Sequence, residues 1–347
     1  MNRFGRILCV ELFGESHGAR IGAIIDGCPA GIALRSEDFE ADLSRRRSGV
    51  SGTTPRRESD MPVIVSGIYQ GCSTGAPICV TFSNDDTRSV DYERFAAVPR
   101  PGHADFTSRA KYRGFSDPRG SGHFSGRITT GLVAAGVIAK KILGPVVFDT
   151  RILSAGGRRD IEKSIEEARA ADDSVGALVE IRVTGLPAGL GEPFFDACES
   201  VIAHAVFAVP GIRGVEFGDG FGAAAMRGSM HNDPFLDAQG RTLRNGAGGI
   251  NGGITNGNEL VVRAAVKPTS SIAAAQTTFD FEKGEMTELR IEGRHDACIA
   301  LRSAVVIEAA IALALADLSL AAAAGGGSGY AAWAGASKNN DPERRNI

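Results

Sequence analysis

Three of the six histidines lie in short strings that combine glycine with ionisable or hydroxyl side chains. His17 is in FGESHG at 13–18, His103 in RPGHAD at 100–105 and His295 in GRHDA at 293–297. Imidazole gives and takes protons near neutral pH, and glycine lets the backbone turn or approach a ligand closely. A single such histidine is equally well explained by a hydrogen bond to its own loop. Three together predict proton chemistry on a bound ligand.

Arginines are a second group of candidates. Three follow one another at 45–47 at the end of a predicted helix, and more lie in predicted loops at 56–57 and 88. A run at a helix end can simply stabilise the helix dipole as a solvent-exposed charge cluster. In loops, guanidinium groups typically bind phosphate or carboxylate through paired hydrogen bonds. Together the arginines favour an anionic substrate, although the helix-end explanation remains open for residues 45–47.

The segment 267–271, KPTSS, places one cation and three hydroxyls just beyond a predicted strand. Such a segment suits a phosphate or the polar edge of a flavin, although hydroxyl-rich turns are common. The sequence contains no P-loop, and no G-x-G-x-x-G follows a strand and opens a helix. Nucleotide sites of the Walker and Rossmann types are therefore disfavoured.

Composition limits the class of protein. The 38 basic and 41 acidic residues leave a net charge of −3, which argues against general binding to nucleic acid or to a membrane surface. Any anion site must therefore be local. Glycine contributes 45 of 347 residues, about 13% and nearly twice the usual share, which predicts many turns and ligand-facing loops.

Cysteine spacing and the apolar segments point to a cytoplasmic enzyme without a metal site. The six cysteines form no C-x-x-C pair and have no histidine at zinc spacing, so we expect them to be reduced and buried. The first residues have no apolar signal core. Charged residues interrupt the most apolar region, which disfavours a membrane span; they are Arg302, Glu308 and Asp317.

Apolar periodicity predicts a mixture of helices and strands in one domain, residues 1–324, followed by a flexible tail at 325–347. Strands are expected at 21–26, 62–69, 77–83, 178–184, 260–266 and 287–292. Helices are expected at 37–47 after a capping Ser36, and at 131–143, 161–171, 197–209 and 299–320, the last being the longest. Residues 84–126 have little periodicity and are interpreted as functional loops, an active-site lid.

Ten strings, taken together, resemble the chorismate synthase family. They are FGESHG, RRRSG, STGAPI, NDDTRSVDY, RPGHAD, GVEFGDGF, GSMHND, GGINGGITNG, KPTSSI and RHDAC, in the family's order and at roughly its spacing, over residues 4–320. The resemblance implies an α+β fold, a β-α-β sandwich with helices between two antiparallel sheets, assembled as a homotetramer. It implies reduced FMN as cofactor and the 1,4-elimination of phosphate from 5-enolpyruvylshikimate 3-phosphate, giving chorismate, the last common step toward the aromatic amino acids.

The resemblance also assigns roles to individual residues. His17 is similar to the histidine that protonates the departing phosphate, and His103 to the one that controls the charge of the reduced flavin. Asp296 is similar to the carboxylate that removes the ring proton together with flavin N5. The implied substrate contacts are Ser16, Arg46 and Arg127. The implied flavin contacts are His123, Phe124, Ser125, Pro210, Gly211, Gly252, Lys267, Pro268, Thr269, Ser270, Ser271 and Arg294.

The chain departs from the commonest family pattern at three places. GSGHFSGR at 120–127 replaces GGGRSSAR, so an arginine is lost and an aromatic ring gained. Gly52 occupies a position that is usually basic, for which Arg56 or Arg57 are alternatives, and 210–211 is Pro-Gly where Asn-Ala is common. A paralogue that binds flavin or a shikimate-like anion without turnover is therefore the alternative. Whether NADPH reduces the flavin on this chain or an external flavin reductase supplies it is left open.

Overall fold

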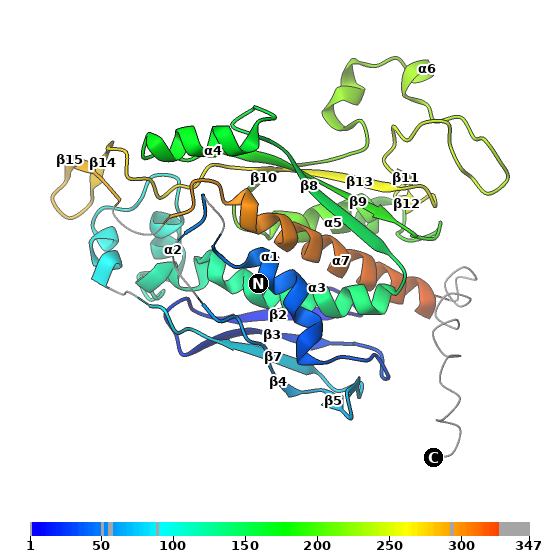
Figure 1. Ribbon diagram of the computed structural model, residues 1–347, viewed down its shortest axis with the longest axis horizontal. Helices are drawn as coiled ribbons and strands as arrows, with labels where there is room; N and C mark the ends of the chain where they lie inside the picture. The colour runs from blue at the N-terminus through cyan, green and yellow to red at the C-terminus, as the bar shows by residue number, and fades with distance from the viewer. Residues whose placement is uncertain (1, 50–51, 55–57, 88–89, 292–294, 326–347) are drawn as a thin grey trace.

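Two antiparallel sheets enclose a layer of helices in the computed structural model (Figure 1). The structure describes residues 2–49, 52–54, 58–87, 90–291 and 295–325. Most of the predicted tail therefore lies outside the described residues. The predicted α+β sandwich is confirmed.

The first sheet has the strand order β1-β2-β3-β7-β4. Its inner face is apolar because alternate side chains of a strand point to the same face. In β3, for example, Ile21, Ala23 and Ile25 are buried while Ile24 is exposed. The strands are β1 (Arg3–Phe4), β2 (Cys9–Gly14), β3 (Arg20–Asp26), β4 (Val63–Ser66) and β7 (Ile78–Ser83).

The second sheet has the order β10-β13-β9-β8. Val179, Ile181 and Val183 of β9 are buried against the helices, and Glu180 between them pairs with Arg182 and Arg263. The strands are β8 (Val147–Ala155), β9 (Ala177–Thr184), β10 (Ile212–Phe217) and β13 (Leu260–Val266), and α4 (Ile161–Ala170) packs beside β8.

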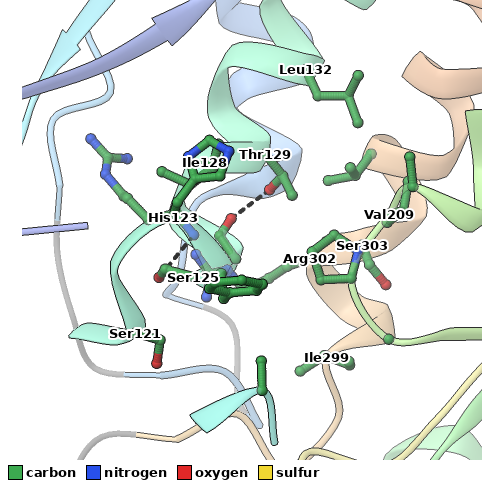
Figure 2. Close-up of a pocket in the computed structure, with 18 of the residues that line it drawn as sticks. Ser121, His123, Ser125, Ile128, Thr129, Leu132, Val209, Ile299, Arg302 and Ser303 are labelled. Carbon is green, nitrogen blue, oxygen red and sulfur yellow. Dashed lines mark hydrogen bonds between the residues drawn. The ribbon is translucent and has the colours of Figure 1, made fainter. Parts of the chain in front are cut away.

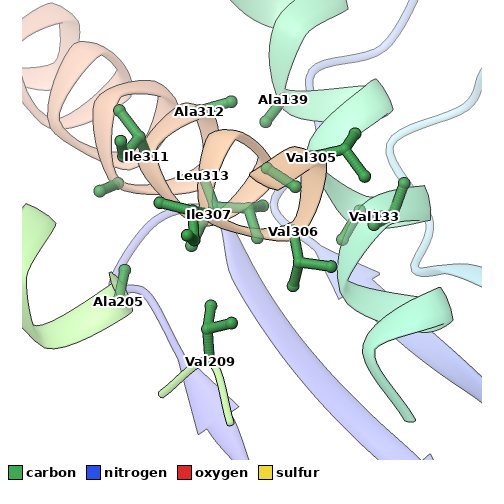
Figure 3. Close-up of a cluster of buried hydrophobic side chains, with 14 of the residues drawn as sticks. Val133, Ala139, Ala205, Val209, Val305, Val306, Ile307, Ile311, Ala312 and Leu313 are labelled. Atoms are coloured by element: carbon green, nitrogen blue, oxygen red, sulfur yellow. The ribbon is translucent and has the colours of Figure 1, made fainter. Parts of the chain in front are cut away.

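Four helices fill the space between the sheets: α1 (Glu40–Arg46), α3 (Thr129–Leu143), α5 (Cys198–Phe207) and α7 (Ala300–Ala324). Two glycines allow close packing, since a Cβ on Gly131 would lie 2.7 Å from the carbonyl oxygen of Gly22, and one on Gly136 would lie 2.4 Å from Cβ of Ala309. Figure 3 shows α7 packed against α3 on one side and α5 on the other. By length and composition α7 could cross a membrane, but 83% of its most apolar window is buried inside the protein, which suits a core helix.

One prediction for local structure was wrong, and two strands were predicted with bounds that differ from the observed ones. Ser36 is not a helix cap, because the helix begins with a 3-10 turn, η1 (Ser36–Phe39), whose N-cap is Arg35. The strand predicted at 62–69 divides at Gly67, where φ is +83°. The strand predicted at 287–292 instead belongs to a hairpin of β14 (Gln276–Asp280) and β15 (Glu285–Leu289).

The segment 84–126 is more regular than predicted. It contains α2 (Asp105–Tyr112) and the 3-10 helices η2 (Val90–Ala96) and η3 (Arg119–Phe124), and it is followed by η4 (Gly126–Ile128). Such short turns have too few apolar residues to show a helical period. The remaining elements are β5 (Ile68–Tyr69), β6 (Cys72–Ser73), β11 (Ile250–Asn251), β12 (Ile254–Thr255), η5 (Phe194–Asp196), η6 (Gly220–Ala225) and α6 (Gly228–His231).

Candidate active site

A cavity of about 940 Å³ lies where the loops around η3, the end of β13 and the start of α7 meet. In Figure 2, Ser121, His123 and Ser125 lie on one side of it and Val209, Ile299 and Ser303 on the other. Most residues singled out in the sequence line this cavity. They are Arg46, His103, His123, Phe124, Ser125, Arg127, Pro210, Gly211, Lys267, Pro268, Thr269, Ser270, Ser271, His295 and Asp296.

Three predicted site residues are not in the cavity wall formed by the described residues. Gly252 lies in the turn between β11 and β12, which Figure 1 shows at the opposite end of the second sheet from α2. Ser16 and His17 lie behind Gly120, since a Cβ on Gly120 would be 2.5 Å from Nε2 of His17 and 2.8 Å from Oγ of Ser16. Arg294 is outside the described residues.

His103 is fixed by a carboxylate two residues away. Its Nδ1 lies 2.7 Å from Oδ1 of Asp105, and Asp105 is held by Arg100 through Nε and Nη2, at 2.7 Å each. Burial lowers the pKa of His103, and the nearby charges of Arg100 and Lys267 act in the same direction. The carboxyl of Asp105 keeps a pKa well below its ordinary value because the hydrogen bonds from Arg100 and His103 outweigh its burial. The cluster therefore favours a neutral imidazole beside a permanent carboxylate.

Arg46 lies in the cavity wall. It is not a solvent-exposed charge that stabilises the end of its helix, which was one explanation for the run at 45–47. It is 2% exposed. Its guanidinium donates to the carbonyl of Gly126 at 2.8 Å and to Oγ1 of Thr129 at 3.1 Å. Burial and the neighbouring charge of Arg302 lower the pKa of Arg46 to about 9. The helix-end explanation is therefore wrong for this residue.

Asp60 connects the two predicted substrate arginines. Its carboxylate lies 3.4 Å from Nη1 of Arg46 and forms an ion pair with Nη1 of Arg127. All three side chains are almost completely buried. Arg127 also donates to the carbonyl of Ser83 at 2.8 Å. The arginines are thus held in fixed positions before any ligand binds.

The other two arginines of the run each pair with a carboxylate. Arg45 binds Glu308 with two hydrogen bonds of 2.9 and 2.6 Å, and Arg47 pairs with Glu40. Successive residues of a helix point in different directions, so a run of three cannot address one ligand. Arg46, Arg47 and the following Ser48 line the cavity, whereas Arg45 is not among the described residues of its wall.

Asp296 is held from two sides at the start of α7. Its Oδ1 accepts from the backbone N–H of Thr54 at 2.8 Å, and Oδ2 pairs with Nη1 of Arg302 at 3.1 Å. Arg302 also donates to the carbonyl of Arg46 at 2.9 Å. The carboxylate is therefore fixed in position at the cavity.

The segment 267–271 forms part of the cavity wall beside Gly102. Lys267 donates to the carbonyl of Gly102 and to Oγ of Ser270, both at 2.6 Å. Burial, with the nearby charge of Arg213, lowers the pKa of Lys267. Within the described part of the chain, the buried hydroxyl of Thr269 has no hydrogen-bond partner. An unsatisfied buried hydroxyl costs free energy, so its position indicates a contact for a ligand.

The cavity continues into an apolar lobe between α3, α5 and α7. Leu132, Val209 and Ile299 contribute to it, and Figure 2 shows Val209 and Ile299 on the same side as Ser303. The hydroxyl of Ser303 is buried and has no partner among the described residues. The cavity thus offers both an apolar surface and polar groups to a planar ligand.

The three departures from the family pattern have structural explanations. Nδ1 of His123 lies 2.8 Å from the carbonyl of Gly14, so this ring is anchored in the wall. A Cβ on Gly52 would lie 2.6 Å from Cγ2 of Ile165, at a φ of +89°, so a basic side chain does not fit there. Gly211 has a φ of +94° and accepts from the backbone N–H of Lys267 at 2.9 Å, a contact that depends on its backbone alone. Arg56 and Arg57 are outside the described residues.

Sequence reasoning missed several residues of the site. Arg100 and Asp105 are both in the quoted string RPGHAD, and a carboxylate two residues from a histidine was a usable signal. Arg302 was interpreted only as an interruption of an apolar run. Asp60 gave no signal, because it is an isolated carboxylate whose two partners are distant in the sequence. Across the described ranges, no group of three or more His, Cys, Asp or Glu side chains could hold a metal ion.

Comparison with known proteins gives one consistent result. The family model described as chorismate synthase matches residues 8–320. A chorismate synthase from Chitinophaga pinensis is 58% identical over 90% of this chain and 95% of its own length. One from Dehalococcoides mccartyi is 44% identical over 89% of this chain and 93% of its own length. A crystal structure of chorismate synthase superposes with a TM-score of 0.71 at 25% identity, covering 91% of this chain and 93% of that one.

Proposed function

The chain belongs to the chorismate synthase family, and we propose that it converts 5-enolpyruvylshikimate 3-phosphate to chorismate by an FMNH2-dependent 1,4-elimination of phosphate. The observation that carries this proposal is a single cavity that contains an oriented imidazole, His103, a fixed carboxylate, Asp296, and two buried arginines, Arg46 and Arg127. A binding protein without turnover, the alternative, is not favoured, since the relatives it matches are named as the enzyme.

The described residues fit a flavin in this cavity. The unpartnered hydroxyls of Thr269 and Ser303 suit a planar ligand with a polar edge, and Ile299 and Val209 suit its apolar face. We propose that the segment 267–271, with Pro210 and Gly211, holds FMN. When bound and reduced, FMN supplies a transient source of electrons, and the reaction has no net redox change.

The arginines of the cavity would receive the substrate. A phosphorylated dicarboxylate brings several negative charges, and a fixed guanidinium contributes on the order of 1.5–3 kcal/mol per charge-assisted hydrogen bond. Arg46, Arg127 and Arg302 already have defined orientations from Asp60 and Asp296. Preorganised cations of this kind stabilise the leaving phosphate without reorganising during the reaction.

Two groups would handle the protons. Asp296, which Arg302 holds in position, would accept the ring proton. His103 is kept neutral by burial and by Arg100, so it can hold a proton shared with the cofactor. His17, which lies against Gly120 of the cavity wall, would protonate the departing phosphate.

The context of the reaction is also proposed from family membership. We expect a cytoplasmic homotetramer whose flavin is reduced by an external flavin reductase or by NADPH. The absence of a Rossmann-type segment in the sequence favours the external reductase.

The test is an anaerobic assay of phosphate and chorismate with purified full-length protein. With chemically reduced FMN, we expect equal amounts of both products and no loss of reductant. With oxidised FMN and no reductant, we expect no product. Turnover with oxidised FMN would contradict the proposal, and a third reaction with FMN and NADPH alone measures whether the chain reduces its own flavin.

A further inference from the structure

Ser121 has an unusual backbone conformation in the cavity wall. Its φ and ψ are 68° and 12°, in the left-handed region, and Gly120 and Gly122 on either side also have positive φ. A residue with a Cβ is disfavoured in this region, and the commonest family pattern has glycine at this position. An outlier of this kind at a site calls for an explanation in terms of what its side chain does.

The side chain of Ser121 accepts a hydrogen bond from Arg100. Nη2 of Arg100 has two hydrogens, and it has two acceptors nearby: Oδ1 of Asp105 at 2.7 Å and Oγ of Ser121 at 2.8 Å. Nε of Arg100 donates to Oδ2 of Asp105, and Nη1 donates to Ser271 at 3.1 Å. The two hydrogens of Nη2 therefore have two acceptors closer than any other group near this nitrogen.

This count determines which nitrogen of His103 carries the proton. Nδ1 lies 3.1 Å from Nη2 of Arg100, and it competes for the hydrogens of Nη2 with the closer Oδ1 of Asp105 and Oγ of Ser121. Nδ1 also lies 2.7 Å from Oδ1 of Asp105, which can only accept. Nδ1 must therefore be the protonated nitrogen, and Nε2 carries the lone pair.

The hydroxyl hydrogen of Ser121 faces that lone pair. Oγ of Ser121 lies 3.5 Å from Nε2 of His103, and its acceptor side is already taken by Arg100. The same hydroxyl therefore acts on both nitrogens of the ring, directly on Nε2 and through Arg100 on Nδ1.

We propose that Ser121 is a positioning residue that sets the tautomer of His103. Without its hydroxyl, one hydrogen of Nη2 becomes available to Nδ1, and the tautomer with the proton on Nε2 gains a partner. The charged groups that face the ring are Arg100 and Asp105 from its own segment and Lys267 from the end of β13. None of them changes when Ser121 is replaced, so a change in tautomer reports the hydroxyl alone.

The test is ¹⁵N NMR of histidine-labelled, full-length protein without ligands, with the His103 signals assigned by His103→Asn. Two variants remove the hydroxyl. Ser121→Ala keeps a Cβ at a residue with positive φ, whereas Ser121→Gly removes the Cβ and the strain that goes with it, so the second variant should fold. The control is Ser108→Ala, which removes a hydroxyl from the same segment that donates only to the carbonyl of Asp105 at 3.0 Å.

In the wild type and in Ser108→Ala we expect Nδ1 protonated and Nε2 unprotonated. In both Ser121 variants the tautomer ratio should shift toward Nε2 by about two- to tenfold, the range that corresponds to one ordinary hydrogen bond. Unchanged His103 signals in both variants would overturn the inference. So would an equal shift in Ser108→Ala.

The consequence for catalysis rests on the proposed function of His103. If the tautomer matters there, Ser121→Ala and Ser121→Gly should lower kcat and move the pH profile, with KM for the substrate nearly unchanged. The two failures are distinguishable, because the NMR result needs neither flavin nor substrate. A tautomer shift in a protein without elimination activity refutes the proposed function and supports the inference.

Discussion

At the residue scale, the position of His17 depends on the absence of a side chain at Gly120. A Cβ there would lie 2.5 Å from the imidazole, and the φ of +59° is itself unfavourable for alanine. The ring of His17 also packs edge-on against Tyr92, with centroids 5.5 Å apart. His17 therefore has little room to give way.

We expect Gly120→Ala to displace His17 and to lower kcat by about 10²-fold or more, the lower end of what a positioned general acid contributes. The matched control is Gly126→Ala, six residues away along the chain. No described atom lies within 4 Å of a Cβ at Gly126, and its φ is ordinary. Steady-state kinetics that show equal activity for the two variants would mean that His17 does not protonate the leaving group.

Residue types were predicted better than residue partners. His103 and Asp296 carry visible motifs, so both could be found in the sequence. The burial of Arg46 could not, since it results from Asp60, Thr129 and Gly126, which lie elsewhere in the chain. The role of each arginine at 45–47 therefore depends on its partners in the folded protein, which the sequence does not show.

At the element scale, an ionic cluster joins three helices and a strand. Glu308 of α7 binds Arg45 of α1, Lys140 of α3 and, at 2.5 Å, Thr150 of β8. Burial alone would raise the pKa of Glu308, but the hydrogen bonds from Arg45 and Lys140 lower it to about 2. The cluster fixes the relative positions of α1 and α7, which deliver Arg46 and Asp296 to the cavity.

Replacing Glu308 should destabilise the fold in a pH-dependent way. The folded pKa of about 2 lies below the ordinary 4.5, so Glu308 stabilises the protein above pH 4.5, and this contribution is lost as the pH falls toward 2. Glu308→Gln should lower the free energy of unfolding by about 3–5 kcal/mol at pH 7, because two cations lose a buried partner. Denaturant titrations of this variant should show a shallower loss of stability between pH 4.5 and 2.

Glu167→Gln is the control for this prediction, since Glu167 pairs with Arg158 at the surface with both side chains about half exposed. Exposed pairs of this kind contribute little to stability because solvent screens them. If the two variants lost equal stability, the cluster around Glu308 would not be what holds α1 against α7.

The elements that sequence reasoning identified are those whose stability comes from one strong apolar pattern. The long apolar α7 and the alternating β9 and β13 were all recognised at nearly their observed bounds. The helix α2 and the 3-10 helices η2 and η3 were not recognised. Their sequences have no clear apolar periodicity, so their conformation depends on contacts with other parts of the chain. Positive φ at three successive residues of η3 is an example, since only two of them are glycine.

At the scale of the whole molecule, the sandwich brings together segments that are far apart in the chain. The cavity wall combines residues near positions 46, 103, 123, 210, 267 and 296. They lie in loops that connect the strands of the two sheets, and at or near the ends of the central helices α1, α5 and α7. The order of the motifs identified the family, but only the fold shows that Asp296 has Arg302 as its partner and that Gly252 lies away from the cavity.

The central claim is that this cavity carries out the elimination with Asp296 as the proton acceptor. The adjacent His295 is a second candidate for that role. It also lines the cavity, and the ordinary pKa of histidine is closer to neutral pH than that of aspartate. The measurement is the single-turnover rate of chorismate formation, without oxygen and with chemically reduced FMN, for the wild type, Asp296→Asn and His295→Asn. We expect Asp296→Asn to be slower by roughly 10²–10⁴-fold, with flavin and substrate still bound, and His295→Asn to be much less affected. A nearly active Asp296→Asn together with an inactive His295→Asn would contradict this account of the site.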